Sequence, residues 1–309
     1  MESKETTDLY TDNHSDDAKR IGELLRDVLR TQTDAKLMRM GSMTNRTYRA
    51  DLEDGRTVIV RLPGDGTQEM IDRADERNST VLANRLGLDA QLLYFGENGE
   101  KVTAYIPDAV TMSPETMRSG QRIRQAAQML RTLHACGEDV GYAFDVFALA
   151  DLYETVALRH GISLFPQFRS AKDAVLRIQR EQTDVSGETR VFCHNDPIYA
   201  NWLLDQNEKM YLIDWEYAGM NDPLWDLADL SIESDFLPCH DEMLLTAYLQ
   251  REPDSHTVRR FLANKIYVDY VWSLWAKARE PFEEDWIIEY GNIRYARMQR
   301  QIEAYGQQR

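Results

Sequence analysis

The first third of the chain alternates between helical and strand-like hydrophobic patterns. Apolar residues recur at a helical period over residues 18–30, which predicts a helix there. Strand-like stretches follow over 37–50 and 57–62, joined by the turn Glu53-Asp54-Gly55. The pattern therefore predicts a strand pair after an N-terminal helix.

A second helix and a second hairpin follow. Residues 71–86 have a helical period and end at Gly87, a residue type that commonly follows the last helical turn. The stretches 92–95 and 102–106 predict two strands across the turn at 97–99. The expected order is strand, strand, helix, strand, strand.

The remainder of the chain is mostly helical. Pro107 interrupts the last strand and opens a connection with few apolar residues, which we interpret as a hinge between two domains. Beyond it we expect helices over 115–134, 147–160 and 166–180, short strands over 190–193, 202–204 and 210–213, and helices rich in aromatic residues from 224 onwards. The predicted division is a disordered tail at 1–17, a small domain at 18–106 and a larger one at 107–309. The predicted class is α+β.

Composition and charge argue against some classes of binding partner. The chain has 309 residues, a formal charge of −16 and a pI near 4.9, which argues against nucleic acid or an anionic membrane as a partner. No apolar run approaches the roughly 20 residues of a membrane span, and the polar, acidic N-terminus resembles neither a signal nor a transit peptide. Three widely spaced cysteines suit a reducing compartment, so we expect a cytoplasmic protein. The oligomeric state stays open.

One motif predicts the chemistry. His194, Asp196 and Asn201 have the spacing His-x-Asp-x4-Asn, and Asp214 follows a short strand-like run. In phosphoryl transfer of the protein-kinase type, the first Asp accepts the substrate hydroxyl proton, while the Asn and the second Asp hold Mg²⁺. We therefore expect Asp196 to be the catalytic base and His194 to orient the loop. The alternative for Asp196 is a loop carboxylate that caps the next turn.

Two charged residues upstream are candidates for phosphate contacts. Arg61 follows the alternating strand at 58–60, where protein kinases commonly have a Lys. Arg can contact phosphate oxygens in a bidentate manner, with Glu76 of the next helix as its partner. The alternative for each is an ordinary solvated charge.

A short loop is the other candidate for nucleotide contacts. Ser42, Thr44 and Asn45 lie in a Gly-Ser-Met-Thr-Asn segment between two strand-like stretches, and could cover phosphates with backbone N–H groups and short polar side chains. The segment is not G-x-G-x-x-G and could also be a simple turn. Tyr105 and Ile106, at the predicted hinge, complete the expected nucleotide-binding set.

Aromatic residues are enriched near the C-terminus. Trp272 and Trp275 are three residues apart on a helical stretch and so share a face. Such a pair is more often core than ligand cage. Aromatic cages also recognise quaternary ammonium groups, which makes a cationic substrate pocket a candidate in an acidic kinase.

These segments together resemble the choline/ethanolamine kinases, most closely the bacterial choline kinases, within the protein-kinase-like and aminoglycoside phosphotransferase superfamily. The segments that resemble the family are Gly-Ser-Met-Thr-Asn at 41–45, Val-Arg-Leu at 60–62, Cys-His-Asn-Asp at 193–196 with Asn201, Tyr-Leu-Ile-Asp-Trp-Glu-Tyr at 211–217, Met-Asn-Asp-Pro-Leu-Trp-Asp-Leu-Ala at 220–228 and Val-Trp-Ser-Leu-Trp at 271–275. They extend over most of the chain.

The resemblance implies a bilobal protein-kinase-like fold, with a small β-rich N-lobe and a larger, mostly helical C-lobe. It implies ATP and Mg²⁺ as cofactors and choline as the substrate that is phosphorylated on its hydroxyl. Arg61 is normal in that family. Matched by position, Asp196 is the catalytic residue, and Asn201 and Asp214 are the metal ligands. The implied substrate-binding residues are Tyr199, Glu216, Trp225, Glu233, Trp272, Trp275 and Tyr295.

Other functions remain open on the sequence. A kinase for ethanolamine, thiamine or an aminoglycoside would have the same fold, although an aminoglycoside needs several carboxylates where this chain has paired indoles. A choline-sensing pseudokinase is a different class, and the intact Asp196, Asn201 and Asp214 argue against it.

Overall fold

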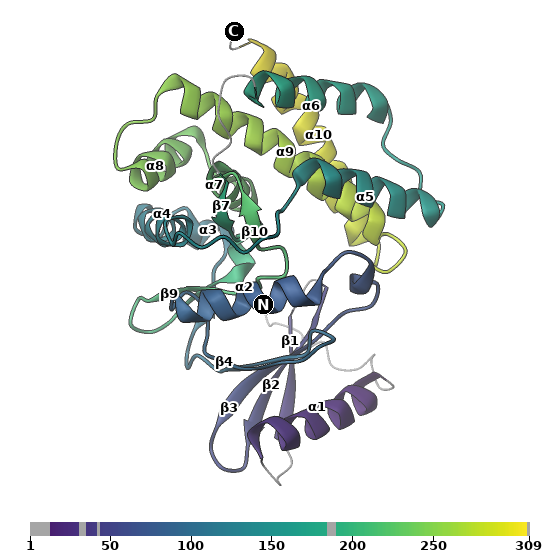
Figure 1. The fold of residues 1–309 in the computed structure, drawn as a ribbon, viewed down its shortest axis with the longest axis vertical. Helices are drawn as coiled ribbons and strands as arrows, with labels where there is room; N and C mark the ends of the chain where they lie inside the picture. The colour runs from purple at the N-terminus through teal and green to yellow at the C-terminus, as the bar shows by residue number, and fades with distance from the viewer. Residues whose placement is uncertain (1–12, 31–34, 42–43, 184–189, 308–309) are drawn as a thin grey trace, which may run out of the picture. The chain divides into compact units, whose positions relative to one another are not determined.

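An antiparallel sheet forms the centre of the N-terminal part of the chain (Figure 1). The computed structural model describes residues 13–30, 35–41, 44–183 and 190–307. The sheet has the order β1-β2-β3-β5-β4, and its strands are β1 (Ala35–Met40), β2 (Arg46–Leu52), β3 (Thr57–Leu62), β4 (Leu92–Phe95) and β5 (Lys101–Ala104). Both predicted hairpins are present, because β2 pairs with β3 and β4 with β5 in antiparallel register.

Helix α1 (Asn13–Leu29) covers one face of this sheet. Ile21 and Leu25 are buried in one cluster with alternate residues of β2 and β3, as the period of two along a strand requires. The helix begins before residue 18, so the predicted tail of 1–17 is wrong for residues 13–17, and residues 1–12 lie outside the described part. Asp17 anchors this first part of the helix, because its carboxylate accepts hydrogen bonds from Arg46 Nε at 2.9 Å and the Tyr48 hydroxyl at 2.7 Å.

The chain divides into two compact units, and they differ from the predicted domains in one helix. The first unit is Met1–Thr67 with Ala90–Ile106, and the second is Gln68–Asp89 with Pro107–Arg309. Helix α2 (Arg73–Arg85) belongs to the second unit, although it lies between strands of the first in sequence. The reason is its apolar face: Leu82 and Ala83 are buried in the core of the second unit.

Short strands in the second unit surround the predicted catalytic loop. Strand β7 (Val191–Cys193) pairs with β10 (Gly219–Asn221), and β8 (Trp202–Leu204) lies between β6 (Val110–Thr111) and β9 (Met210–Leu212). These pairs bring residues 194–201 and 213–218 to the ends of neighbouring strands.

Helices make up most of the second unit. They are α3 (Pro114–Met117), α4 (Gly120–His134), α5 (Val146–Arg159), α6 (Phe168–Thr183), α7 (Pro223–Glu233), α8 (Pro238–Leu249), α9 (Ser255–Arg279) and α10 (Trp286–Gln307). The helix predicted over 115–134 is two helices, because Ser113 and Ser119 each cap a new N-terminus with a side-chain hydrogen bond. Helix α9 is buried on all sides between residues 266 and 276 and packs against α5, α7 and α10.

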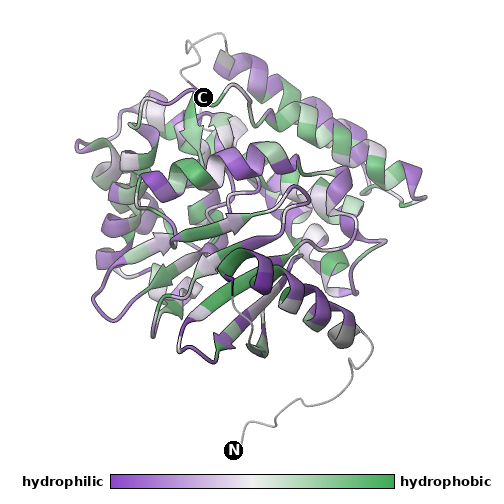
Figure 2. Cartoon of the chain, turned by 60° about the horizontal axis from the view of Figure 1, so that its bottom comes forward, coloured by the Kyte–Doolittle hydropathy of each residue, from purple (hydrophilic) through white to green (hydrophobic). Residues whose placement is uncertain are grey.

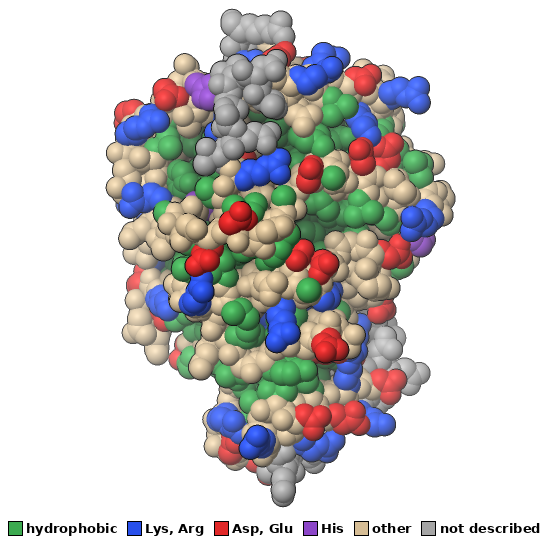
Figure 3. Space-filling view, viewed as in Figure 1, with side chains coloured by type: hydrophobic (Ala, Val, Ile, Leu, Met, Phe, Trp, Pro, Cys, Tyr) green, Lys and Arg blue, Asp and Glu red, His purple; other side chains and the backbone are tan. Residues whose placement is uncertain are grey.

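The outer helices carry both polar and apolar residues (Figure 2), as expected for helices with one buried face. On the face drawn in Figure 3, acidic and basic side chains are interspersed. Among the described residues, no helix is both long and apolar enough to cross a membrane.

Candidate active site

The predicted catalytic residues Asp196 and Asn201 meet in one short loop between β7 and β8. The Asn201 amide Nδ2 donates to the Asp196 backbone carbonyl at 2.9 Å and to its carboxylate oxygen Oδ2 at 3.2 Å. Both amide hydrogens therefore point toward Asp196, which leaves the amide oxygen as the atom that can ligate a cation. The short 3₁₀ turn Tyr199–Asn201 sets this geometry.

Both ring nitrogens of His194 lie within hydrogen-bond distance of backbone groups. Its Nδ1 accepts the backbone N–H of Asp196 at 3.2 Å, so its Nε2 carries the hydrogen and donates to the Ile213 carbonyl at 3.0 Å. Both ring nitrogens are thus used on the backbone, one beside the catalytic carboxylate and one beside Asp214. This agrees with the expected orienting role and leaves no nitrogen for taking a substrate proton.

Asp226, to which the sequence analysis gave no role, fixes the start of the loop. Its carboxylate accepts the backbone N–H of His194 at 2.8 Å and that of Asn195 at 2.7 Å, and the His134 ring nitrogen Nε2 lies 2.9 Å away. All four residues are buried. Asp226 is part of the Asp-Leu-Ala segment quoted above. A carboxylate that accepts hydrogen bonds from backbone groups has no characteristic spacing in a sequence, so the sequence does not identify this role.

Asp214 follows β9 in a left-handed backbone conformation, with φ of 69°. Such a conformation is uncommon for a residue other than Gly and needs surrounding contacts to hold it. The Ile213 N–H donates to the Asn201 carbonyl at 2.9 Å, and the buried Trp215 donates from Nε1 to the Leu212 carbonyl at 3.1 Å. These bonds hold Asp214 beside the catalytic loop.

Negative charge accumulates around the carboxyl of Asp196, the predicted catalytic residue. Burial, followed by the charges of Asp229, Asp214 and Glu216, raises the pKa of Asp196 well above its usual range, and Arg294 opposes this. A site with this much negative charge favours a bound cation.

Three carboxylates could hold a divalent metal. Oxygen atoms of Glu76, Asp214 and Glu216 lie within 4.8 Å of one another. The Arg73 guanidinium nitrogen Nη1 donates to Glu76 at 2.6 Å and to Glu216 at 3.2 Å, so it partly neutralises the group. Hard carboxylate and amide oxygens are the ligands that Mg²⁺ prefers, and the donors here fit that ion. Glu216, expected at the substrate, therefore lies with the metal-binding candidates.

The predicted nucleotide loop is anchored from inside the first unit. Asn45 is buried, and its side-chain oxygen accepts the Gly64 N–H at 3.4 Å. A β-carbon on Gly64 would lie 1.7 Å from the Thr44 carbonyl oxygen, so only Gly permits this approach. Asn45 thus supports the loop that carries Thr44, while Ser42 lies outside the described residues.

The structure also shows the surroundings of Arg61 and of Tyr105 and Ile106, the residues expected at the hinge. Arg61 is buried, and its Nη2 donates to the Gly99 carbonyl at 2.9 Å. The Tyr105 ring lies under the Arg49 guanidinium, 4.5 Å from ring centre to carbon, and Ile106 is half-buried. Arg61 and Glu76 belong to different units, so their pairing stays a prediction.

The two predicted tryptophans belong to an aromatic cluster that we define as Tyr217, Trp272, Trp275 and Tyr290. Ring centres lie 5.0 Å apart for Tyr217 and Trp272, 6.2 Å for Trp272 and Trp275, and 5.8 Å for Trp275 and Tyr290, all near edge-to-face. The Trp275 Nε1 donates to the Tyr217 hydroxyl at 3.0 Å. The tryptophans are 3% and 5% exposed, while both tyrosines are half-buried.

The aromatic cluster lies next to the catalytic loop. Asn195 donates from its side chain to the Tyr217 carbonyl at 3.0 Å. Trp272 donates from Nε1 to Asp229 Oδ1 at 3.1 Å. Asp229 also acts on Asp196, and burial raises the pKa of Asp229 to about 8. Catalytic loop, carboxylates and aromatic rings thus form one site within the second unit.

Three further residues expected at the substrate have defined surroundings in the structure. Tyr295 stacks on Phe165 with ring centres 4.2 Å apart, and its hydroxyl donates to the Pro166 carbonyl at 2.9 Å. It is Tyr290, on a different side of α10, that contacts Trp275, because five residues turn a helix by about 140°. Trp225 donates from Nε1 to the Asn195 carbonyl at 2.9 Å and supports the loop. Tyr199, also expected here, is half-buried in the 3₁₀ turn.

Glu233 is paired with a buried arginine that the sequence analysis did not identify. Arg294 forms ion pairs with Glu233 and, at 3.2 Å, with Asp269, and its guanidinium carbon lies 4.4 Å from the centre of the Tyr290 ring. Burial, with the nearby Arg297 charge, lowers the pKa of Arg294 to about 9. Arg294 therefore occupies one face of the Tyr290 ring, and Glu233 contacts the site through Arg294.

Comparison with known proteins gives a consistent set of relatives. Residues 38–270 match the family model described as choline/ethanolamine kinase. A choline kinase, LicA from Streptococcus pneumoniae, is 31% identical, with a TM-score of 0.82 over 94% of this chain and 100% of that one. Protein LicA of Haemophilus influenzae is 26% identical over 79% of this chain and 92% of its own length. A macrolide 2'-phosphotransferase from Brachybacterium faecium, 18% identical, has the same fold, with a TM-score of 0.58 over 88% of this chain and 97% of that one.

Proposed function

Because the chain belongs to the choline/ethanolamine kinase family, we propose that it transfers the γ-phosphoryl group of ATP to the hydroxyl of choline, giving phosphocholine and ADP. The observation that carries the choice of choline is the aromatic cluster beside Asp196, built from Tyr217, Trp272, Trp275 and Tyr290. Kinases of this family act on choline or ethanolamine, and the cluster favours the first.

The chemistry of the two ammonium groups supports this choice. A trimethylammonium group has no N–H to donate, so a site can hold it only with π-faces and nearby negative charge. The aromatic cluster offers the first, and Asp229, which is bonded to Trp272, offers the second once a bound cation favours its ionised form. The ammonium of ethanolamine would leave N–H donors unpaired against aromatic rings, at a cost of about 1–3 kcal/mol for each buried donor.

The residues of the catalytic loop have separate roles in the proposed reaction. The choline oxygen attacks the γ-phosphorus, its proton moves to the Asp196 carboxylate, and the bond to the ADP oxygen breaks. His194 and Asp226 hold that carboxylate in place through backbone hydrogen bonds. Mg²⁺ would neutralise phosphate charge, held by Asn201 and Asp214 with Glu76 or Glu216 beside them.

A substrate panel tests the proposal. The purified chain is incubated with ATP, Mg²⁺ and choline, ethanolamine, thiamine or an aminoglycoside, and ADP release is measured. We expect kcat/KM for choline to exceed that for ethanolamine by at least about tenfold, one mispaired donor being worth that factor. The Asp196→Asn variant is the control for contaminating kinases. A preference for ethanolamine would refute choline as the substrate, and binding of choline without ADP release would support a sensor.

The cytoplasmic location stays a prediction.

A further inference from the structure

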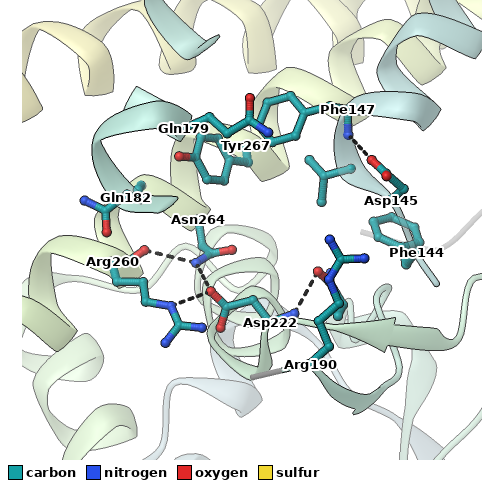
Figure 4. Close-up of a pocket in the computed structure, with 13 residues that line it drawn as sticks. Phe144, Asp145, Phe147, Gln179, Gln182, Arg190, Asp222, Arg260, Asn264 and Tyr267 are labelled. Carbon is teal, nitrogen blue, oxygen red and sulfur yellow. Dashed lines mark hydrogen bonds and ion pairs between the residues drawn. The ribbon is translucent and has the colours of Figure 1, made fainter. Parts of the chain in front are cut away.

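The second unit contains a pocket that none of the proposed catalytic residues lines (Figure 4). Its cavity volume is about 150 Å³, and the pocket is open to solvent on one side. It is enclosed by the start of α5, the end of α6, the strand end at Arg190, the cap of α7 and one face of α9. Residues 260, 263, 264 and 267 recur on α9 at helical spacing, so one face of that helix forms a wall.

One side of the pocket suits a cation. The rings of Phe147 and Tyr267 meet edge-to-face with centres 5.3 Å apart, and both line the pocket. Asp145 lies beside them, and its oxygen Oδ1 accepts the N–H of Phe147 at 3.1 Å. In Figure 4 these three residues enter from the same half of the pocket. Aromatic faces with a neighbouring carboxylate attract an ammonium group.

The opposite side suits an anion. Arg190 and Arg260 rise from the lower half of the pocket in Figure 4 together with Asp222, and the Arg190 guanidinium points toward the middle of the pocket. The Arg260 Nε donates to Asp222 Oδ2 at 2.7 Å, and Asn264 donates to the same oxygen at 3.0 Å, which fixes the guanidinium at the wall. Guanidinium groups bind phosphate and carboxylate oxygens with paired hydrogen bonds.

The walls of the pocket are bonded to the active site. Asn221 lines the pocket, and its Nδ2 donates to the side-chain oxygen of Asn195 at 2.9 Å. Phe144 also lines it, with its ring centre 5.1 Å from Trp225 and 6.2 Å from Trp272. A ligand here would therefore contact residues that touch the catalytic loop and the aromatic cluster.

We propose that this pocket is a second binding site for a small zwitterion with an ammonium group at one end and a phosphate at the other. The ammonium lies against Phe147, Tyr267 and Asp145, and the phosphate lies against Arg190 and Arg260. The product of the proposed reaction, phosphocholine, has this chemistry, and for the identity of the zwitterion the inference rests on the proposed function. A bound product would then act on the kinase from a site that choline does not displace.

Calorimetric titration of the full chain with phosphocholine tests the site. We expect two classes of binding, one at the active site and one at the pocket. Arg190→Gln and Asp145→Asn should each weaken the binding of phosphocholine at the pocket by at least about tenfold, since each removes one charged group that contacts the ligand. Asn is itself a good helix cap, so Asp145→Asn retains the start of α5. The matched controls are Arg177→Gln and Asp173→Asn, exposed residues of α6 outside the pocket, and neither should change binding.

Two further arms separate the outcomes. Choline alone and inorganic phosphate alone should each bind the pocket at least about tenfold more weakly than phosphocholine. Equal binding of phosphate alone, with no effect of Asp145→Asn, would overturn the zwitterion. A single class of binding that Arg190→Gln leaves unchanged would overturn the site itself. Absence of ADP release with choline would refute the proposed function alone, because the titration needs no turnover.

Discussion

The catalytic loop and the aromatic cluster are neighbours in one site, yet different forces hold them. The loop is fixed by hydrogen bonds to buried polar groups: Asp226 holds its start, and His194 joins Asp196 to the residue before Asp214. The aromatic cluster is fixed mainly by packing, with Trp272 and Trp275 in the part of α9 that is buried on all sides. Directional bonds position single atoms, whereas packing positions surfaces.

This difference suits the two tasks. Proton transfer needs a carboxylate oxygen within hydrogen-bond reach of one hydroxyl, so the loop must be accurate to a fraction of an ångström. A cation over an aromatic face has no preferred direction and tolerates small shifts. Changes in the loop should therefore affect kcat, and changes in the aromatic cluster should affect KM for the cationic substrate.

The largest effect is expected from Asp196→Asn, which keeps the shape of the base and removes its basicity. We expect kcat to fall by about 10²–10⁴-fold with KM for ATP little changed, because general-base catalysis is worth that much. Steady-state kinetics with choline and ATP measure it. If the variant kept more than about a tenth of the parent kcat, Asp196 would not be the base.

A smaller loss is expected from Asp226→Asn, which tests whether backbone bonds hold the loop. The amide has one acceptor oxygen where the carboxylate has two, so an N–H of His194 or Asn195 would face a second donor. A shift of the loop by about 1 Å can cost roughly 10²-fold in kcat, and the buried unpaired group lowers stability by about 1–3 kcal/mol. Asp173→Asn on α6 is the control, and unchanged kcat at full folding would show that the loop is held by other contacts.

The aromatic half of the comparison is tested by a matched pair on α10. Tyr290 contacts Trp275, whereas Tyr295 stacks on Phe165. A desolvated cation–π contact is worth about 2 kcal/mol, so Tyr290→Leu should raise KM for choline by roughly thirtyfold while KM for ATP stays near the parent value. Tyr295→Leu should leave KM for choline within about threefold. If Tyr295→Leu raised KM for choline strongly and Tyr290→Leu did not, the prediction made from the sequence, with Tyr295 at the substrate, would stand.

These regions also differ in how far the sequence could predict them. His194, Asp196, Asn201 and Asp214 form a motif in which each role follows from spacing, and the structure brings them together. The fold class was predicted correctly for a similar reason, since hairpins and helix caps are local. Tyr295 and Glu233 were expected at the substrate from family position. In the structure Tyr290, not Tyr295, contacts Trp275, and Glu233 is paired with Arg294.

The differences between the expected and the observed surroundings share a physical cause. Which side of α10 faces α9 is decided by how the two helices pack. Both helices have apolar residues on several sides, so the helical period of apolar residues does not identify the side that makes the contact. Asp226 and Arg294 are charged and fully buried, and a sequence gives no sign of burial for such residues. The early start of α1 depends on Asp17 reaching Arg46 and Tyr48, contacts about 30 residues away along the chain.

The smallest effect is expected at Asp229, where the two regions join through its bond to Trp272. Burial raises its pKa from the usual value of 3.8 to about 8, so the stability linked to its bound proton is fully present below about pH 4 and is lost as pH rises through about 8. Asp229→Asn cannot titrate and can still accept the Trp272 hydrogen bond. The Tm of the variant should therefore rise relative to the parent between pH 5 and pH 8.5, by several °C, while Asp173→Asn shows no such trend. Saturating choline should reduce the difference, because a bound cation favours the ionised carboxyl. A Tm difference that is the same at both pH values, with and without choline, would show that Asp229 does not titrate in this range and that negative charge near the aromatic cluster comes from elsewhere.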